Sequence, residues 1–202
     1  MEIIIIAGGS GSGKSALAYT LEDHYPNVFE VMNLDDYHKL KTSIGLPMLE
    51  NKINWDHPGV IQWDKLIKDI ALLQNGKPVT INSWSHRSNR DYFKHGKMIP
   101  RTMVPKKALI IEGNMVLWNK QIKDLSSRSY FLNLDDETRM RRRNKFIDPD
   151  YDSKVLQPMH KMYVVPTMSY ADIILNVTKM NQAEVYFNIE HDLKETYTFL
   201  QA

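Results

Sequence analysis

An eight-residue segment near the start of the chain constrains its fold more than any other feature. Residues 8–15 read Gly-Gly-Ser-Gly-Ser-Gly-Lys-Ser, which matches the pattern G-x-x-x-x-G-K-[ST] in full. The apolar, β-branched run Glu2–Ala7 before it predicts a buried strand, and the apolar residues of Lys14–His24 after it predict a helix. A glycine-rich loop between a buried strand and a helix is typical of α/β proteins that bind phosphate groups at that loop.

The residues of this loop indicate how it would bind a nucleoside triphosphate. Glycines let several backbone N–H groups point inward at phosphate oxygens, and the positive end of the helix dipole adds to the attraction. We expect Lys14 to reach the β- and γ-phosphates and Ser15 to ligate Mg²⁺. A glycine-rich turn without a ligand is the alternative, which the complete spacing disfavours. The predicted ATP-binding residues are Gly8, Gly9, Ser10, Gly11, Ser12, Gly13, Lys14 and Ser15.

Apolar segments along the rest of the chain predict a parallel sheet covered by helices. Strands are expected at residues 2–7, 28–34, 78–82, 108–111, 128–134 and 173–177, and helices at 14–24, 60–74, 136–146, 153–166 and 183–200. The polar segments 35–58 and 83–105 are expected to be loops. Together they predict an α/β, three-layer fold of the P-loop NTPase type, with a central parallel sheet of about five strands and a small helical lid. We expect one domain over residues 1–202, with the lid at about 139–166.

Composition restricts the partners of the chain. The net charge is +2 over 202 residues, which gives no general attraction to nucleic acid. There are no cysteines, so disulfides and thiol chemistry are excluded. The apolar run Ile3–Ala7 is too short to span a bilayer. We therefore expect a cytoplasmic protein with a small-molecule acceptor, without nucleic-acid or membrane partners, and a homo-oligomer remains open.

Two acidic motifs stand where predicted strands end, beside the glycine-rich loop in a sheet of this kind. In Asp35-Asp36-Tyr37, one carboxylate is a candidate base for an attacking hydroxyl; a solvated turn or a helix cap is the alternative. In Glu112-Gly113, the carboxylate is a candidate ligand of Mg²⁺, directly or through water.

A cluster of arginines occupies the predicted helix 136–146. Their guanidinium groups are suited to stabilise phosphoryl charge, which predicts a lid over the triphosphate. The alternative is a solvated basic helix face. The cluster consists of Arg139, Arg141, Arg142 and Arg143.

With these motifs, the sequence resembles the uridine kinase family of P-loop kinases, which includes nicotinamide riboside kinases. Besides the glycine-rich loop, the matching pieces are Asp35-Asp36-Tyr37, Trp55-Asp56-His57-Pro58, Glu112-Gly113, Thr138-Arg139 with Arg142-Arg143, and Tyr170-Ala171-Asp172-Ile173-Ile174. The resemblance implies that Asp35 is the base toward a 5′-hydroxyl and that Asp56 accepts hydrogen bonds from two ribose hydroxyls. From the residues alone, Asp56 would be a helix N-cap.

The resemblance also implies that Glu112 serves Mg²⁺ and that Arg139 and Arg142 reach substrate and phosphates. The predicted catalytic residues are therefore Asp35, Lys14 and Arg142, and the predicted metal ligands are Ser15 and Glu112. The predicted acceptor-binding residues are Asp35, Tyr37, Asp56, His57, Trp84, His86 and Arg139.

Two segments depart from the uridine kinase pattern. Residues 81–87 keep one aromatic residue and a histidine where the family has a Tyr-Asp-Phe run before its histidine. Trp84 is a candidate to stack on a flat base and His86 to hydrogen-bond to it; a loop anchor and a solvated histidine are the alternatives. Residues 144–150 replace the usual lid sequence, and this part looks more like nicotinamide riboside kinases.

The sequence therefore predicts an Mg²⁺-dependent kinase that transfers the γ-phosphoryl group of ATP to the 5′-hydroxyl of a uridine- or cytidine-like ribonucleoside. A nicotinamide riboside kinase or another small-alcohol kinase is the nearest alternative. A regulatory P-loop switch, which hydrolyses slowly and signals by a change of shape, is the alternative from another class. A nucleic-acid-processing ATPase ranks last, because the chain is short and nearly neutral.

Overall fold

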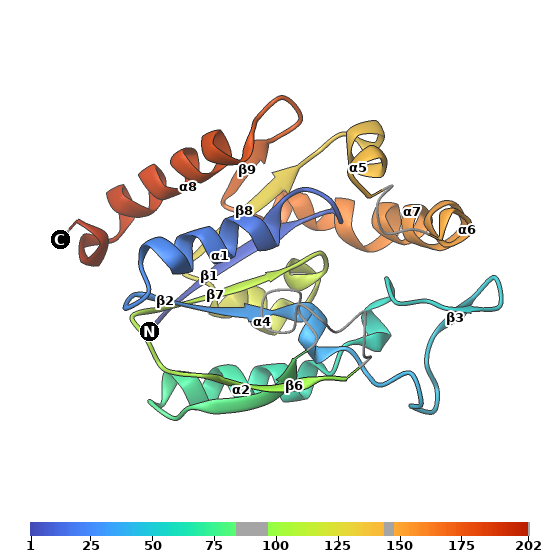
Figure 1. Ribbon diagram of the computed structural model, residues 1–202, viewed down its shortest axis with the longest axis horizontal. Coiled ribbons are helices and arrows are strands. Elements are labelled where there is room, and N and C mark those ends of the chain that lie inside the picture. The colour runs from blue at the N-terminus through green and yellow to red at the C-terminus, as the bar shows by residue number, and fades with distance from the viewer. Residues whose placement is uncertain (84–96, 144–147, 202) are drawn as a thin grey trace.

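A five-stranded parallel sheet forms the centre of the protein, as the computed structural model shows (Figure 1). The structure describes residues 1–83, 97–143 and 148–201. The strand order is β2-β7-β1-β8-β9, and all four neighbouring pairs are parallel. The strands are β1 Glu2–Gly8, β2 Phe29–Asn33, β7 Ala108–Gly113, β8 Arg128–Asn133 and β9 Ile173–Asn176. The predicted α/β fold with about five parallel strands is confirmed.

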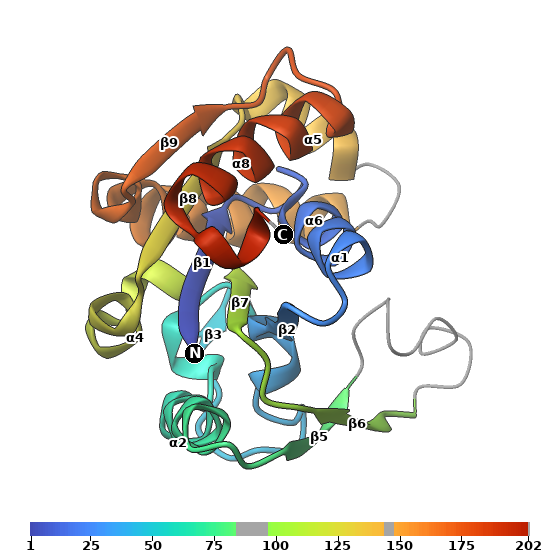
Figure 2. The ribbon, with the colours of Figure 1, turned by 90° about the vertical axis from the view of Figure 1, so that its left-hand side faces the viewer.

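The side chains on the two faces of the sheet pack into two separate hydrophobic cores. In β1, Ile3 and Ile5 point into one core and Ile4 and Ile6 into the other, because successive side chains leave a strand on opposite faces. All four are buried, which explains the continuous apolar run. Helices α1 (Lys14–His24) and α8 (Gln182–Thr196) cover one face. Helices α2 (Trp63–Gln74) and α4 (Lys120–Leu125) cover the other (Figure 2).

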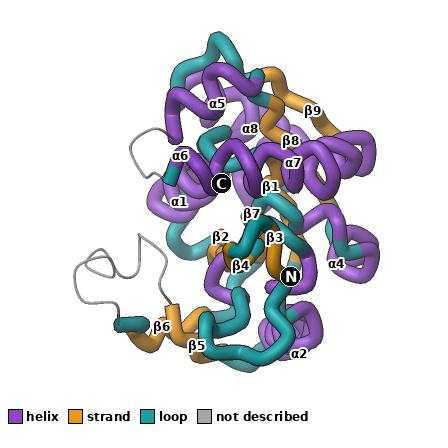
Figure 3. The backbone as a smooth tube through the Cα atoms, turned by 90° about the vertical axis from the view of Figure 1, so that its right-hand side faces the viewer, coloured by secondary structure: helices purple, strands orange, loops and turns teal. Residues whose placement is uncertain are grey.

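Several segments differ from the sequence-based expectations. The strand expected at residues 78–82 is present as β5 (Val79–Ser83), but it pairs antiparallel with β6 (Ile99–Met103) in a separate two-stranded ribbon. The alternating burial of β5 shows that it covers the core on one face only, unlike a central parallel strand. This ribbon and α2 lie at one end of the molecule, and α5 (Asp136–Arg143) and α8 lie at the other (Figure 3).

The expected loop 35–58 contains a short hairpin, β3 (Met48–Leu49) with β4 (Lys52–Ile53). The helix expected from Val60 begins at Trp63, because Val60 closes a 3₁₀ turn and Ile61 forms a bridge to His38. Helix α4 was not expected, since six residues are too few to establish a helical period.

The predicted lid helix is a succession of short helical segments after α5. Helices α6 (Pro149–Tyr151) and α7 (Gln157–Met159) are linked by π-helical turns at Asp152–Leu156 and His160–Val164, and a 3₁₀ helix follows at Val165–Tyr170. Such π turns often occur at functional sites. In the three described ranges, no helix is long and apolar enough to cross a membrane.

Candidate active site

The glycine-rich loop lies between β1 and α1 and presents the amino end of α1. Gly11 and Gly13 have φ values of +87° and +97°, a region that favours glycine, and Gly13 directly precedes the helix. No side chain caps the first turn of α1, so its amides remain available to phosphate oxygens. The Lys14 ammonium donates to the Gly9 carbonyl at 3.1 Å, within the curl of the loop.

The lid packs directly on this loop at Gly9. A Cβ atom added at Gly9 would lie 2.7 Å from Cε1 of His160 and 2.8 Å from Cδ of Arg139, so a larger residue there would displace these lid side chains. Burial, followed by the charge of Arg139, lowers the pKa of His160 to about 4. His160, which belongs to the lid, is therefore uncharged at neutral pH where it meets the loop.

Glu112, at the end of β7, is buried beside Lys14 and Ser15. Burial raises the pKa of its carboxyl to about 7, against the lowering effect of the Lys14 charge and a hydrogen bond with Ser15. Burial also lowers the pKa of Lys14, against the charges of Glu112 and Asp35. The Oε1 atom of Glu112 is buried and has no hydrogen-bond partner among the described residues.

This arrangement fits a divalent cation that is bound mainly by a nucleotide. Ser15 and the free Oε1 of Glu112 supply hard oxygen ligands, as Mg²⁺ requires. The described residues contain no cluster of three or more metal-binding side chains. The remaining ligands would then be phosphate oxygens and water, which is the usual way of holding Mg²⁺ in phosphoryl transfer.

Asp35 and Asp36 point in different directions after β2. Asp35 lines the main cleft and its side chain is 58% exposed, with His38 Nε2 at 3.9 Å from its Oδ1. Asp36 is buried and accepts from the Ser83 hydroxyl at 2.9 Å. Only Asp35 of the pair is therefore placed to meet a substrate.

Asp56 lies deeper in the same cleft and is held by two residues. Its Oδ2 accepts from the Tyr151 hydroxyl at 2.8 Å and its Oδ1 from Nδ2 of Asn114 at 3.3 Å. Burial raises the pKa of Asp56, and the Tyr151 hydrogen bond is the strongest influence against this rise. The Oδ1 atom of Asn114 is buried and has no hydrogen-bond partner in the described part of the chain.

Two lid arginines contact the glycine-rich loop. Nη1 of Arg142 lies 3.5 Å from the Gly11 carbonyl, and Arg143 donates to the Ser10 hydroxyl. Arg143 also binds the buried carboxylate of Asp152, with Nη2 at 2.8 Å. Both arginines line the main cleft, so their charge faces the space beside the loop.

One cleft of about 1280 Å³ unites most of these groups. It brings together the predicted residues Ser10, Gly11, Gly13, Lys14, Ser15, Asp35, Asp56, Glu112 and Arg142. A second hollow of about 470 Å³ adjoins it between α1 and the start of α8, and shares Gly11, Gly13 and Arg142 with it. Gly8, Gly9 and Ser12 belong to the loop but do not line the main cleft.

Three residues predicted to bind the acceptor have structural partners and do not line the cleft. Tyr37 is buried and donates to Asp69 at 3.0 Å. His57 accepts from the Gly59 amide at 2.9 Å. Arg139 is 1% exposed and binds Asp136, with Nη2 at 2.8 Å. Trp84 and His86 lie outside the described residues.

Sequence reasoning missed Tyr151 and Asn114 and did not select Arg143 from the arginine cluster. Asn114 directly follows Glu112-Gly113, and that position was a signal that could have been used. Tyr151 carried no comparable signal, because it is 95 residues away from Asp56 in the chain. Trp55 and His38, whose rings stack at 5.8 Å, also line the cleft.

Known proteins resemble this chain over most of its length. The sequence model of the phosphoribulokinase/uridine kinase family matches residues 3–184. The uridine kinase of Chlamydia pneumoniae is 29% identical over 220 residues, covering 98% of this chain and 95% of that protein. The uridine kinase of Streptococcus pyogenes serotype M5 is 30% identical over 186 residues, with 86% of each chain covered.

Solved structures share the fold at lower identity. A protein described as a possible uridine kinase from Bacillus stearothermophilus superposes with a TM-score of 0.60 at 16% identity, over 87% of this chain and 88% of the other. Shikimate kinase from Acinetobacter baumannii, in complex with shikimate, gives a TM-score of 0.54 at 12% identity, over 97% and 94%. These structural matches concern the fold alone.

Proposed function

This chain belongs to the phosphoribulokinase/uridine kinase family, and from that premise we propose that it transfers the γ-phosphoryl group of ATP to the 5′-hydroxyl of a ribonucleoside. The observation that carries the proposal is the shared cleft. It holds the amino end of α1 with Lys14, the exposed carboxylate of Asp35 and the half-buried carboxylate of Asp56. A phosphate donor and an alcohol acceptor would meet there.

The donor would lie along the glycine-rich loop. The α1 amides and Lys14 bind its phosphates, and the adjoining hollow beside α8 offers space for its base and sugar. Arg142 and Arg143 place positive charge over the triphosphate, where charge develops during transfer. Mg²⁺, held by Ser15 and Glu112 with phosphate oxygens, would neutralise further charge on the phosphates.

The acceptor would bind by its sugar at Asp56. A carboxylate has about four acceptor positions, and Tyr151 and Asn114 use one each. The two that remain suit two neighbouring hydroxyls, as on a ribose. This supports a nucleoside above an alcohol with a single hydroxyl.

Asp35 would steer the reaction at the 5′-hydroxyl. As the new bond forms between the 5′-oxygen and the γ-phosphorus, the bond from that phosphorus to the bridging oxygen breaks and ADP leaves. The hydroxyl proton passes to the carboxylate of Asp35. The exposure of Asp35 leaves it accessible to an incoming hydroxyl.

We expect Asp35→Asn to reduce kcat by roughly 100-fold or more, in line with the loss of a general base. Asp35 is exposed, so the variant should keep the melting temperature of the wild type. Phosphorylated product is measured by chromatography with ATP, Mg²⁺ and uridine or cytidine. Full activity of a folded Asp35→Asn variant would refute the assignment of the base.

A second candidate acceptor is nicotinamide riboside, which residues 144–150 and the arginine cluster favour by their likeness to nicotinamide riboside kinases. A panel of uridine, cytidine, nicotinamide riboside and the 2′-deoxy analogues separates the candidates. The ribosides should react and the deoxy analogues should react poorly, because they lack one partner for Asp56. ATP turnover that no alcohol increases would favour a regulatory switch instead.

A further inference from the structure

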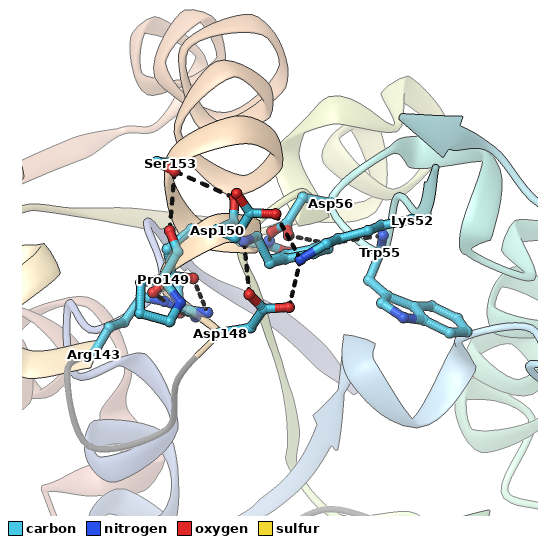
Figure 4. Close-up of polar contacts among 12 residues, drawn as sticks. Lys52, Trp55, Asp56, Arg143, Asp148, Pro149, Asp150 and Ser153 are labelled. Atoms are coloured by element: carbon cyan, nitrogen blue, oxygen red, sulfur yellow. Dashed lines mark hydrogen bonds and ion pairs between the residues drawn. The ribbon is translucent and has the colours of Figure 1, made fainter. Parts of the chain in front are cut away.

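A single short segment of the lid contacts both the acceptor side of the cleft, at Asp56, and the donor side, at Arg143. Asp148 and Asp150 bind the Lys52 ammonium at 2.7 and 3.1 Å, so the segment is fixed to the β3–β4 hairpin (Figure 4). Tyr151 contacts Trp55 and Asp56, which lie in a turn after β4, and Asp152 binds Arg143. Five consecutive residues, 148–152, thus join the acceptor carboxylate to an arginine of the donor side. We call them the coupling segment.

The Tyr151 hydroxyl has a fixed direction. It receives a hydrogen from the Trp55 amide at 2.9 Å, so its own hydrogen is directed at Oδ2 of Asp56, 2.8 Å away. The Tyr151 main chain is held as well, because its amide donates to the Asp148 side chain at 3.1 Å at the start of α6. The tyrosine is therefore a rigid support for one oxygen of Asp56.

Asp152, at the other end of the segment, is connected to the glycine-rich loop through Arg143. Asp152 is 3% exposed and holds Arg143, which also donates to Ser10 of the loop. A movement of the loop or of Arg143 would therefore be passed to Asp152 and, through one peptide unit, to Tyr151. Three polar contacts and one peptide unit thus connect Ser10 to Asp56.

We propose that Tyr151 is a positioning residue for the acceptor, which orients Asp56 only while the coupling segment is docked between Lys52 and Arg143. The proposal rests on the proposed function, since it assumes that Asp56 binds the acceptor. A donor that draws Arg143 onto its phosphates would thereby also set the acceptor site. Tyr151 acts through Asp56 and takes no proton from the substrate.

The test is Tyr151→Phe, which removes the hydroxyl and keeps the ring. The matched control is Tyr170→Phe, because Tyr170 ends the 3₁₀ helix that follows the lid and is 52% exposed. We expect the acceptor KM of Tyr151→Phe to rise by roughly 10-fold, the usual weight of a hydrogen bond to a charged group. The KM for ATP should change by less than about twofold, and the control should match the wild type.

The pH profile gives a second readout that a merely structural role would not move. Loss of the Tyr151 hydrogen bond raises the pKa of Asp56 further, so the acid limb of kcat/KM for the acceptor should shift to higher pH. The other groups that act on Asp56 are Arg143, Asp35, His38 and Lys14, and all stay in the variant. An unchanged acceptor KM with an unchanged acid limb would overturn the proposal.

Amide exchange of the free protein separates this proposal from the proposed function. In Tyr151→Phe, the Trp55 amide keeps only its 3.2 Å contact with the Ile53 carbonyl and should exchange faster. The Asn54 amide, which donates to the Pro47 carbonyl at 2.8 Å, should not change. If the wild type phosphorylated no nucleoside, the proposed function would fail. Faster exchange at Trp55 would still support the docking of the Tyr151 hydroxyl on the Trp55 amide, on which the proposed orientation of Asp56 depends, and unchanged exchange would refute it.

Discussion

Glu112 is the residue whose chemistry the fold alters most clearly. Its side chain is 1% exposed, and burial raises its pKa from 4.5 to about 7. Between these two values, the folded protein binds more protons than the unfolded chain. Stability without ligand therefore falls as the pH rises from about 4.5 to about 7. An ionised Glu112 therefore destabilises the folded protein unless a cation is bound beside it.

We expect Glu112→Gln to be more stable than the wild type above pH 7 in the absence of ligand, by an amount on the order of 3 kcal/mol at 1.36 kcal/mol per pKa unit. The gain should shrink toward pH 5, where the wild-type carboxyl is protonated. Urea unfolding at pH 5, 6 and 8 measures it. A destabilisation of equal size at every pH would contradict the raised pKa.

Gly113, next to Glu112, shows how tightly the end of β7 is packed. A Cβ atom there would lie 2.4 Å from the Cβ of Leu34, which immediately precedes Asp35. Because both are Cβ atoms, neither can turn away, so the two strand ends approach only with glycine at this place. The approach brings Asp35 and Glu112 into one cleft.

The arginines of α5 point in different directions. Arg142 and Arg143 line the cleft, whereas Arg141 is exposed and does not line it. Arg139 is turned inward to Asp136. A helix turns about 100° per residue, so the four arginines cannot all face the cleft. The basic cluster seen in the sequence therefore contains groups of three kinds.

We expect Arg143→Gln to lower kcat/KM for ATP by roughly 10-fold or more, because it removes a charge that faces the triphosphate and the link from Ser10 to Asp152. Arg141→Gln, on the same helix and with the same change of charge, is the control and should stay within about twofold. Steady-state kinetics at fixed ionic strength compare the two. Equal losses in both variants would point to net charge instead of position.

The whole molecule has a cleft between the sheet with its lid and the end that carries β3–β4 and the β5–β6 ribbon. Lys52 on the hairpin and Tyr151 on the lid join the two sides directly. Donor and acceptor ligands would fill different parts of this cleft, and each would stabilise the docked lid. Their binding should therefore be coupled.

We expect a non-hydrolysable ATP analogue to increase the affinity for the nucleoside by roughly fivefold or more, and the nucleoside to increase the affinity for the analogue by the same factor. Isothermal titration calorimetry in both orders of addition measures the coupling. Tyr151→Phe should reduce it toward unity. Independent binding in the wild type would show that the lid does not connect the two sites.

The sequence by itself determined the phosphate-binding loop, the five sheet strands and the family, because each depends on residues that are close in the chain. The β-branched runs of β1 and β7 and the spacing of Gly8–Ser15 are local patterns, and local backbone preference produces them directly. The pairing of β5 with β6 was not predicted, because β6 (Ile99–Met103) lies in the polar segment 83–105, which is expected to be a loop.

Only the tertiary structure decided which side chains face the cleft. The Ser83 hydroxyl, 47 residues away, donates to Asp36, and Tyr37 donates to Asp69, whereas Asp35 lines the cleft. Tyr151 reaches Asp56 across 95 residues and Arg143 reaches Ser10 across 133. Such contacts depend on how the lid packs on the sheet, and packing is a property of the whole chain that no local pattern encodes.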